Sequence, residues 1–329
     1  MRTNHIHKIA VLTSGGDSPG MNAAIRAVVR NAAYQKIDCI GVYRGYQGLI
    51  EKDFINLDAR SVKNIINRGG TFLKSARSKD FKTEEGQKKA FQHLREENID
   101  ALVVIGGDGT FTGASFFSKA HDIPVIGIPA TIDNDIHGTD FTIGYDTALN
   151  TVVEAIDKIR DTASSHDRLF LIEVMGRDAG DIALNSGIGA GAEEILIPEE
   201  NMGIERLIDS LRRSRKSGKT SSIIVVSEGD QIGQNITKLS DDIQTNLPEY
   251  EVKVTVLGHI QRGGSPSCYD RVLASRLGVA AVDALLEGYS NVMVGTRQKK
   301  IVYVDFDKTI GGKKKIDKEL IRVADIVST

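Results

Sequence analysis

The chain has 329 residues, of which 40% are hydrophobic, and a formal net charge of −2. Its 42 basic and 44 acidic residues give no reason to expect nucleic acid or a membrane surface as a partner. At about 150 residues per domain, this length suggests roughly two domains. The N-terminus has no apolar leader, no later run approaches about 18 apolar residues, and the two cysteines lack ligand spacing. We therefore expect a cytoplasmic protein with free thiols.

The first expected strand, residues 9–12, runs into a glycine turn and then into a helix that begins near Met21. Small residues at such a turn let backbone N–H groups approach an anion near the positive end of the helix. The turn has neither of the common nucleotide-binding glycine patterns, so by itself it fits an anion site and a simple tight turn equally well. Arg26 and Arg30 share one face of the helix, where a solvated surface is the simplest interpretation.

Apolar runs alternate with amphipathic segments along the rest of the chain. Residues 45–48 are expected to form a turn. This alternation favours an α/β fold with mostly parallel sheets flanked by helices. We expect strands at 39–43, 101–105, 123–128, 169–174, 194–197, 222–226 and 252–257, and helices at 61–66, 84–97, 146–162, 179–186, 204–215 and up to about 287.

The strands at 101–105 and 123–128 flank a helix-length segment, which predicts one parallel βαβ unit buried on both faces. The turn after each strand carries a carboxylate, Asp108 in the first and Asp133 in the second. Turns at the carboxyl ends of parallel strands open where ligands bind, so we expect these two side chains to face one crevice. A metal-bound polyphosphate beside a hydroxyl that awaits deprotonation would need this arrangement. A single loop carboxylate is otherwise more often a cap or a turn former.

Five motifs occur in order along the chain. They are Thr13-Ser-Gly-Gly-Asp-Ser-Pro-Gly-Met-Asn-Ala-Ala24, Gly106-Gly-Asp-Gly109, Thr131-Ile-Asp-Asn-Asp135, Glu173-Val-Met-Gly-Arg177 and Gly258-His-Ile-Gln-Arg-Gly-Gly-Ser-Pro266. Together they resemble the bacterial ATP-dependent 6-phosphofructokinases, from about residue 8 to about residue 288. The resemblance implies a glycolytic enzyme that moves the γ-phosphoryl group of ATP to the 1-hydroxyl of fructose 6-phosphate, with Mg²⁺, giving fructose 1,6-bisphosphate and ADP. Such a transfer needs positioning and charge neutralisation more than covalent chemistry.

The resemblance also implies roles for individual residues. Asp108 would hold the Mg²⁺, partly through water. Asp133 would be the general base for the sugar hydroxyl, a role typically worth about 10²- to 10⁴-fold in rate. The implied catalytic residues are Asp133, Arg77, Thr131 and Asp135. The implied ATP-binding residues are Gly16, Arg77, Ser78, Gly106, Asp108, Gly109, Thr110 and Gly113. The implied substrate-binding residues are Thr131, Asp133, Asp135, Arg168, Met175, Gly176, Arg177, Glu228, Lys253, His259 and Arg262.

Within the substrate set, Glu228 would accept hydrogen bonds from sugar hydroxyls, while His259 and Arg262 would bind the 6-phosphate. In this family an arginine at the position of Arg168 reaches the substrate of a neighbouring subunit, so a homotetramer with shared active sites is expected. A second such arginine is Lys253 here, which keeps the charge but loses the bidentate geometry. We therefore expect an altered affinity for the sugar phosphate.

The family also carries an effector site for ADP or phosphoenolpyruvate. The other basic and acidic members of its pattern are replaced here by Ala59, Asn64 and Ser217, so regulation would be weakened, altered or absent. The positions that match the effector site are Arg26, Arg30, Arg160, Gly191, Glu193 and Lys219.

The phosphoryl donor can be inferred from two small residues. Pyrophosphate-dependent relatives place an aspartate where Gly109 stands and a lysine where Ala130 stands, so this chain favours ATP. The alternatives are a pyrophosphate-dependent phosphofructokinase, an NAD kinase that would share only the Gly-Gly-Asp-Gly-Thr string, and a non-catalytic sugar-phosphate or nucleotide sensor. The intact Asp108 and Asp133 argue against a sensor, which needs no base at an acceptor hydroxyl.

The resemblance implies two α/β domains with the active site in the cleft between them. Residues 1–144 plus 261–311 would bind ATP, and residues 145–260 plus 312–329 would bind fructose 6-phosphate. Closure of the cleft would exclude water and limit wasteful hydrolysis of ATP.

Overall fold

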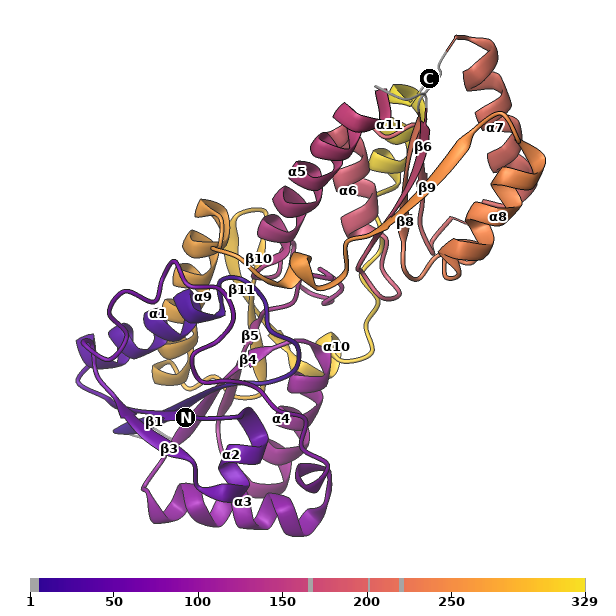
Figure 1. The fold of residues 1–329 in the computed structure, drawn as a ribbon. Coiled ribbons are helices and arrows are strands. Elements are labelled where there is room, and N and C mark those ends of the chain that lie inside the picture. The colour runs from indigo at the N-terminus through magenta and orange to yellow at the C-terminus, as the bar shows by residue number, and fades with distance from the viewer. Residues whose placement is uncertain (1–5, 165–167, 201, 219–221, 329) are drawn as a thin grey trace. The chain divides into compact units, whose positions relative to one another are not determined.

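A computed structural model describes residues 6–164, 168–200, 202–218 and 222–328, which form two compact units (Figure 1). The first unit consists of Met1–Thr131, Ile136–Thr147 and Arg262–Lys314, and the second of Ile132–Asp135, Ala148–Gln261 and Lys315–Thr329. These bounds differ from the expected ones mainly at Ile132–Asp135, a short segment that groups with the second unit. The ligand expected for each domain, and a cleft between them, stay predictions.

The first unit is built on a seven-stranded sheet with the order β11-β10-β5-β4-β1-β2-β3. Its five central strands are parallel, and an antiparallel strand lies at each edge. The strands are β1 (Lys8–Thr13), β2 (Asp38–Val42), β3 (Phe54–Leu57), β4 (Ala101–Gly106), β5 (Val125–Pro129), β10 (Val292–Arg297) and β11 (Lys300–Asp305).

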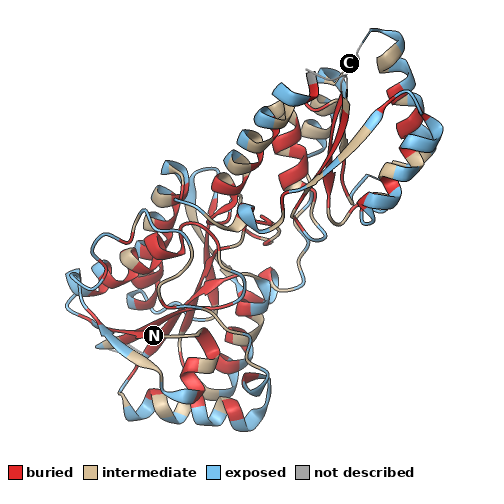
Figure 2. Cartoon of the chain, in the orientation of Figure 1, coloured by how far each residue is buried: buried red, intermediate tan, exposed pale blue. Residues whose placement is uncertain are grey.

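Helices cover both faces of this sheet, because its central strands are apolar on both sides. In β1, Ile9 and Val11 pack into one core cluster with α1 (Met21–Tyr34) and α9 (Cys268–Leu286), while Ala10 and Leu12 face the other cluster. Figure 2 shows these helices buried toward the sheet and exposed on the outside. The second cluster contains residues of α2 (Gly45–Glu51), α3 (Glu84–Glu96) and α4 (Asp108–His121).

The second unit has a fully parallel four-stranded sheet with the order β7-β8-β6-β9. One face packs against α7 (Ile204–Lys216) and α8 (Ile236–Asn246) in a single apolar cluster. The strands are β6 (Arg168–Val174), β7 (Glu194–Leu196), β8 (Ser222–Ser227) and β9 (Glu251–Val256). The remaining helices of the chain are α5 (Tyr145–Ser164), α6 (Asp181–Ala190), α10 (Phe306–Thr309) and α11 (Lys318–Val327), with 3₁₀ turns η1 (Asp80–Lys82) and η2 (Gly258–Arg262). No helix in the described ranges is both long and apolar enough to cross a membrane.

Most of the expected elements are confirmed. The βαβ unit is confirmed, since β4 and β5 are parallel and buried along their whole length. The helix after Thr83 is confirmed as well, and the Thr83 hydroxyl accepts the N–H of Gly86 at 3.1 Å, as an N-cap should.

Two local expectations are wrong. Residues 45–48 begin α2 instead of a turn, and residues 61–66 form turns instead of a helix. The Asp58 carboxylate accepts the N–H groups of Arg60 and Ser61, and Asn64 has a φ of 58°, so the backbone of 61–66 leaves the helical region.

Candidate active site

The expected nucleotide-binding turns follow β1 and β4, which are neighbours in the first sheet. The chain passes from β1 to β2 on one side and later returns to β4 on the other, so a topological switch point lies between β1 and β4. Ligands of open α/β sheets bind outside the carboxyl ends of the strands at such a point. The register pairs Thr13 with Ile105, and the Thr110 hydroxyl donates to the Ser14 carbonyl at 3.0 Å. The two turns therefore form one continuous structure.

The two turns lie too close at Gly106 for a side chain, because a Cβ there would lie 2.3 Å from the Ser14 carbonyl oxygen. Gly16 lies against the end of the flexible Arg262 side chain, and a Cβ there would lie 2.5 Å from its Nη1. The same Nη1 donates to the carbonyl of Asp17 at 3.3 Å. The first unit thus brings Gly16, Gly106, Thr110 and Arg262 together, although Gly16 and Arg262 were expected to bind different substrates.

Asp108 is the first residue of α4, at the positive end of the helix dipole. The protein atoms packed around its carboxylate raise its pKa, and a hydrogen bond from the backbone N–H of Gly311 opposes that shift. A Cβ at the adjacent Gly109 would have no atom within 4 Å, so the space beside this helix terminus is open. The turn therefore offers one fixed carboxylate next to room for a ligand.

Arg77 and Ser78 lie on a loop that is fixed to the turn after β1. The Ser75 hydroxyl donates to the Gly15 carbonyl at 2.5 Å, and the Thr13 hydroxyl donates to the Lys74 carbonyl at 2.8 Å. Arg77 itself is exposed. The loop therefore brings an exposed cation close to a glycine turn, a combination suited to phosphate groups.

In the second unit, the turn after β6 is organised by a carboxylate that follows β8. Oε1 of Glu228 accepts the N–H groups of Gly176 at 3.2 Å and Arg177 at 2.8 Å, and Oε1 of Gln261 accepts the N–H of Met175 at 3.1 Å. Gly176 has a φ of 145° and Arg177 a φ of 52°. These contacts hold the turn in a conformation that side chains rarely adopt.

Asp133 belongs to the same unit and contacts this turn. Its side chain is 2% exposed, and its Oδ2 lies 3.5 Å from Nε of Arg177, whose side chain is 63% exposed. The neighbouring Asn134 donates to Oδ1 of Asp181 at 3.3 Å. The second unit therefore joins a buried carboxylate, a guanidinium that reaches the surface and the Glu228 turn. Thr131 belongs to the first unit, where its carbonyl accepts the Thr142 hydroxyl at 2.6 Å, while Asp135 lies with Asp133.

The two residues expected to cross a subunit interface share one carboxylate. Oε2 of Glu251 lies 2.7 Å from Nε of Arg168, and Oε1 of Glu251 lies 2.7 Å from Nζ of Lys253. These cations lie on the adjacent strands β6 and β9, and their hydrogen bonds lower the pKa of Glu251 to about 2. His259 is exposed in η2, on the chain that follows β9.

The expected effector residues are divided between the units. Arg26 and Arg30 lie on α1, where partial burial and then the charge of Arg30 lower the pKa of Arg26. In the second unit, Arg160 donates to the carbonyls of Ala190 and Gly191, both at 2.7 Å, and lies 3.8 Å from Glu193. Lys219 lies outside the described residues.

Sequence reasoning missed several residues that hold the candidate site residues in place. Gln261 lies inside one of the five motifs and could have been found there. Gln47, which accepts the Ser78 hydroxyl at 2.7 Å, and Glu251, which pairs with Arg168 and Lys253, carried no local signal. Among the described residues no group of three or more His, Cys, Asp or Glu side chains could hold a metal ion by itself. A single carboxylate at Asp108 still fits Mg²⁺, which usually takes one or two carboxylates together with phosphate oxygens and water.

Comparison with known proteins identifies the family. The phosphofructokinase family model matches residues 8–285. The ATP-dependent 6-phosphofructokinase of Halalkalibacterium halodurans is 55% identical over 321 residues, which cover 98% of this chain and 99% of the relative. The solved phosphofructokinase of Saccharomyces cerevisiae is 36% identical with a TM-score of 0.87, over 97% of this chain and 46% of the yeast chain. A pyrophosphate-dependent phosphofructokinase from Marinobacter aquaeolei is 24% identical with a TM-score of 0.84, over 95% of this chain and 86% of that chain, which shows the fold alone. The chain belongs to the phosphofructokinase family.

Proposed function

We propose that the chain is an ATP-dependent 6-phosphofructokinase, which transfers the γ-phosphoryl group of ATP to the 1-hydroxyl of fructose 6-phosphate. The observation that carries this proposal is the chemistry after β4 and β5, where one turn has a fixed carboxylate beside open space and the next has a buried carboxylate paired with Arg177. The name of the relative from Halalkalibacterium halodurans, at 55% identity, supports the same activity.

The first unit would bind the nucleotide. Gly16, Gly109 and the first turn of α4 would offer backbone N–H groups to the phosphates, and Arg77 would add a cation. Asp108 would hold Mg²⁺, which when bound neutralises charge on the phosphate oxygens. This assignment explains why glycine stands where a side chain would clash or would fill the open space.

The second unit would bind the sugar phosphate. Asp133 would take the proton from the 1-hydroxyl, a step that needs an acceptor within about 2.6–3.2 Å of that oxygen. Thr131 and Asp135 would position the same end of the sugar, and Arg177 would offer its outward N–H donors. Arg262 would bind the 6-phosphate from the first unit.

The remaining substrate contacts depend on assembly. Glu228 and Met175 would contact sugar hydroxyls, and His259 the 6-phosphate. Arg168 and Lys253 would reach the substrate of a neighbouring subunit in a homotetramer, and they already share Glu251 within the chain. Assembly would then complete the active site.

A pyrophosphate-dependent enzyme is the second candidate. Gly109 leaves open space where such relatives carry an aspartate, and Ala130 is 1% exposed, so a lysine there would have to enter the core. Both observations favour ATP.

An initial-rate assay tests the proposal. The purified protein receives fructose 6-phosphate and Mg²⁺ with ATP in one series and pyrophosphate in the other. Activity with ATP alone is expected. Activity with pyrophosphate alone would contradict the donor assignment, and binding of fructose 6-phosphate without turnover in either series would favour a sensor.

A further inference from the structure

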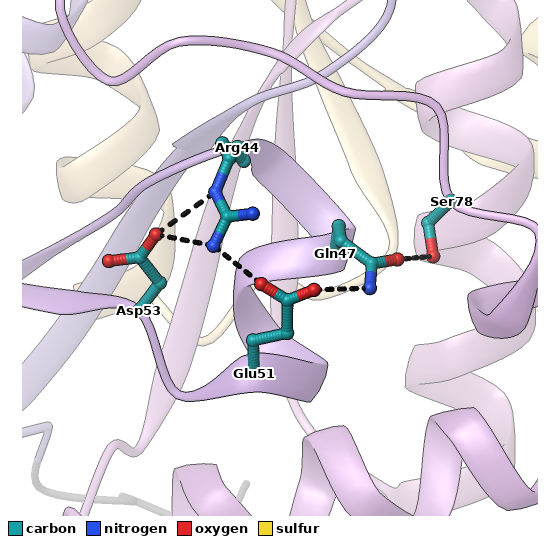
Figure 3. Close-up of polar contacts among 5 residues, drawn as sticks. All are labelled: Arg44, Gln47, Glu51, Asp53 and Ser78. Carbon is teal, nitrogen blue, oxygen red and sulfur yellow. Dashed lines mark hydrogen bonds and ion pairs between the residues drawn. The ribbon is translucent and has the colours of Figure 1, made fainter.

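A chain of polar contacts leads from the surface to the loop that carries Arg77 and Ser78 (Figure 3). The Ser78 hydroxyl donates to Oε1 of Gln47 at 2.7 Å, and Nε2 of Gln47 donates to Oε1 of Glu51 at 2.7 Å. Arg44 donates to the other oxygen of Glu51 at 2.5 Å and to Asp53 at 2.8 and 3.1 Å. The amide of Gln47 therefore connects the loop to the ion pairs that Arg44 makes with Glu51 and Asp53.

The Ser78 hydroxyl is occupied within the protein. Besides donating its proton to Gln47, it accepts the N–H of Phe81 at 3.1 Å, which fixes the start of η1. A hydroxyl has a single proton to donate. Its side chain therefore holds the loop in shape and has no hydrogen left for a ligand.

The helix that carries Gln47 also supports the other side of the nucleotide-binding turns. The adjacent Tyr46 donates to the Thr110 carbonyl at 2.5 Å, and its ring stacks on Phe81 with centroids 4.2 Å apart. A Cβ at Gly113 would lie 3.1 Å from the same ring. Helix α2 thus contacts both α4 and the Ser78 loop, and Gln47 links it to Ser78 by a hydrogen bond.

We propose that Gln47 is a positioning residue for nucleotide binding, which acts through Ser78 to hold the backbone of the Arg77–Ser78 loop. This inference rests on the proposed function, because it takes that loop as part of the nucleotide site. Without Gln47 the loop keeps its contacts to the turn after β1, and Tyr46 still stacks on Phe81, but Ser78 loses its hydrogen bond to α2. The nucleotide must then order the Arg77–Ser78 loop when it binds, and the conformational entropy lost in that step lowers its affinity.

The expected effect is about fivefold on nucleotide affinity, because a neutral hydrogen bond contributes about 1 kcal/mol and a tenfold change corresponds to about 1.4 kcal/mol. Only terms that involve the nucleotide should change. The KM for ATP and the Kd for Mg–ADP rise in Gln47→Ala, while the KM for fructose 6-phosphate and kcat at saturating ATP stay within twofold.

The chain offers a matched control in Gln92→Ala. Gln92 donates to Glu96 at 3.0 Å with the same spacing of four residues as Gln47 and Glu51, but it is exposed on α3 and makes no contact with the loop. Both variants therefore lose a glutamine that donates to a glutamate four residues later in a helix, and only Gln47→Ala also loses a contact with Ser78. Calorimetric titration of each purified variant with Mg–ADP measures affinity without turnover.

A double-mutant cycle separates positioning from general stabilisation. If Gln47 acts through Ser78, Gln47→Ala has no further effect on the Kd for Mg–ADP in a Ser78→Ala background. Equal affinities of Gln47→Ala and Gln92→Ala, or an undiminished effect in that background, would overturn the inference. Wild-type protein that lacks phosphofructokinase activity would instead refute the proposed function, and the Mg–ADP titrations would still decide the role of Gln47.

Discussion

The substitution Gly109→Asp tests how the nucleotide site chooses its phosphoryl donor. A Cβ at this position has no atom within 4 Å, and Gly109 lies in the first turn of α4 without a positive φ. The variant should therefore fold normally and project a carboxylate into the open space. Two unit charges 4 Å apart interact by about 4 kcal/mol at an effective dielectric constant of 20, and by about half of that at twice the distance.

Because the position is exposed, water weakens the repulsion, and we use a repulsion of about 2 kcal/mol between the new carboxylate and the phosphates. This repulsion corresponds to a rise of about 30-fold in the KM for ATP. Initial rates at varied ATP measure this effect. Gly109→Asn separates bulk from charge, and Gly203→Asp is a matched control, since a Cβ at Gly203 also meets nothing within 4 Å and its φ is −67°. An ATP KM in Gly109→Asp within twofold of that in Gly203→Asp would refute the reasoning.

Three further predictions concern the base, stability and regulation. Asp133→Asn should lower kcat by about 10²- to 10⁴-fold while calorimetric binding of fructose 6-phosphate stays within a few fold, and a kcat near that of wild type would exclude Asp133 as the base. Asp270 is buried in the first turn of α9, and this burial raises the pKa of its carboxyl from 3.8 to about 6. Its contribution to the free energy of unfolding is therefore present below about pH 4 and is lost as pH rises through about 6. Chemical unfolding should then show that the free energy of unfolding of wild type falls by up to about 3 kcal/mol relative to that of Asp270→Asn as the pH rises from about 4 to neutral. A difference between the two proteins that stays constant with pH would contradict the raised pKa. At saturating ATP, the dependence of the rate on fructose 6-phosphate should not change with phosphoenolpyruvate, and ADP should act only as a competitor of ATP, whereas a sigmoidal or shifted dependence on fructose 6-phosphate would show that the effector site still signals.

The buried parallel strands were predicted well from the sequence, because short runs of apolar residues between turn signals are typical of such strands. The prediction of a turn at residues 45–48 was wrong, because the glycines there serve close packing and not a turn. A Cβ at Gly45 would lie 2.6 Å from the Thr13 carbonyl, and one at Gly48 would lie 1.8 Å from the Tyr43 carbonyl. These glycines allow α2 to pack closely against the sheet, a tertiary requirement that a local turn pattern cannot reveal.

The hairpin of β10 and β11 was missed for a related reason. Its two connecting residues, Gln298 and Lys299, both have positive φ, at 49° and 65°. Such a turn is usually marked by Asn-Gly or Asp-Gly, which are absent here. The strands themselves lie beyond the motifs that drew attention to the rest of the chain.

A motif can name the proposed site residues, but it does not name the residues that hold them in place. Glu228 could be proposed as a ligand group, but its hydrogen bonds to the turn after β6 join residues about fifty positions apart. Gln47 and Ser78 are separated by 31 positions, and neither is part of a recognisable pattern. Long-range polar contacts of this kind depend on the packed fold, so residue order does not predict them.

Two of the retained effector residues, Arg160 and Glu193, have structural roles that explain their presence without regulation. Oε2 of Glu193 accepts the N–H of Ile223 at 2.6 Å, beside the start of β8, and the Glu193 side chain is only 12% exposed. Arg160 binds the carbonyls at the end of α6, where orphan helix carbonyls need donors. Losing either residue would therefore weaken the second unit whether or not an effector binds. Ala59, Asn64 and Ser217 place no charge at three positions where the family's effector pattern has one. Structural need thus accounts for Arg160 and Glu193 without an effector, and the lost charges are why we expect no response through the effector site.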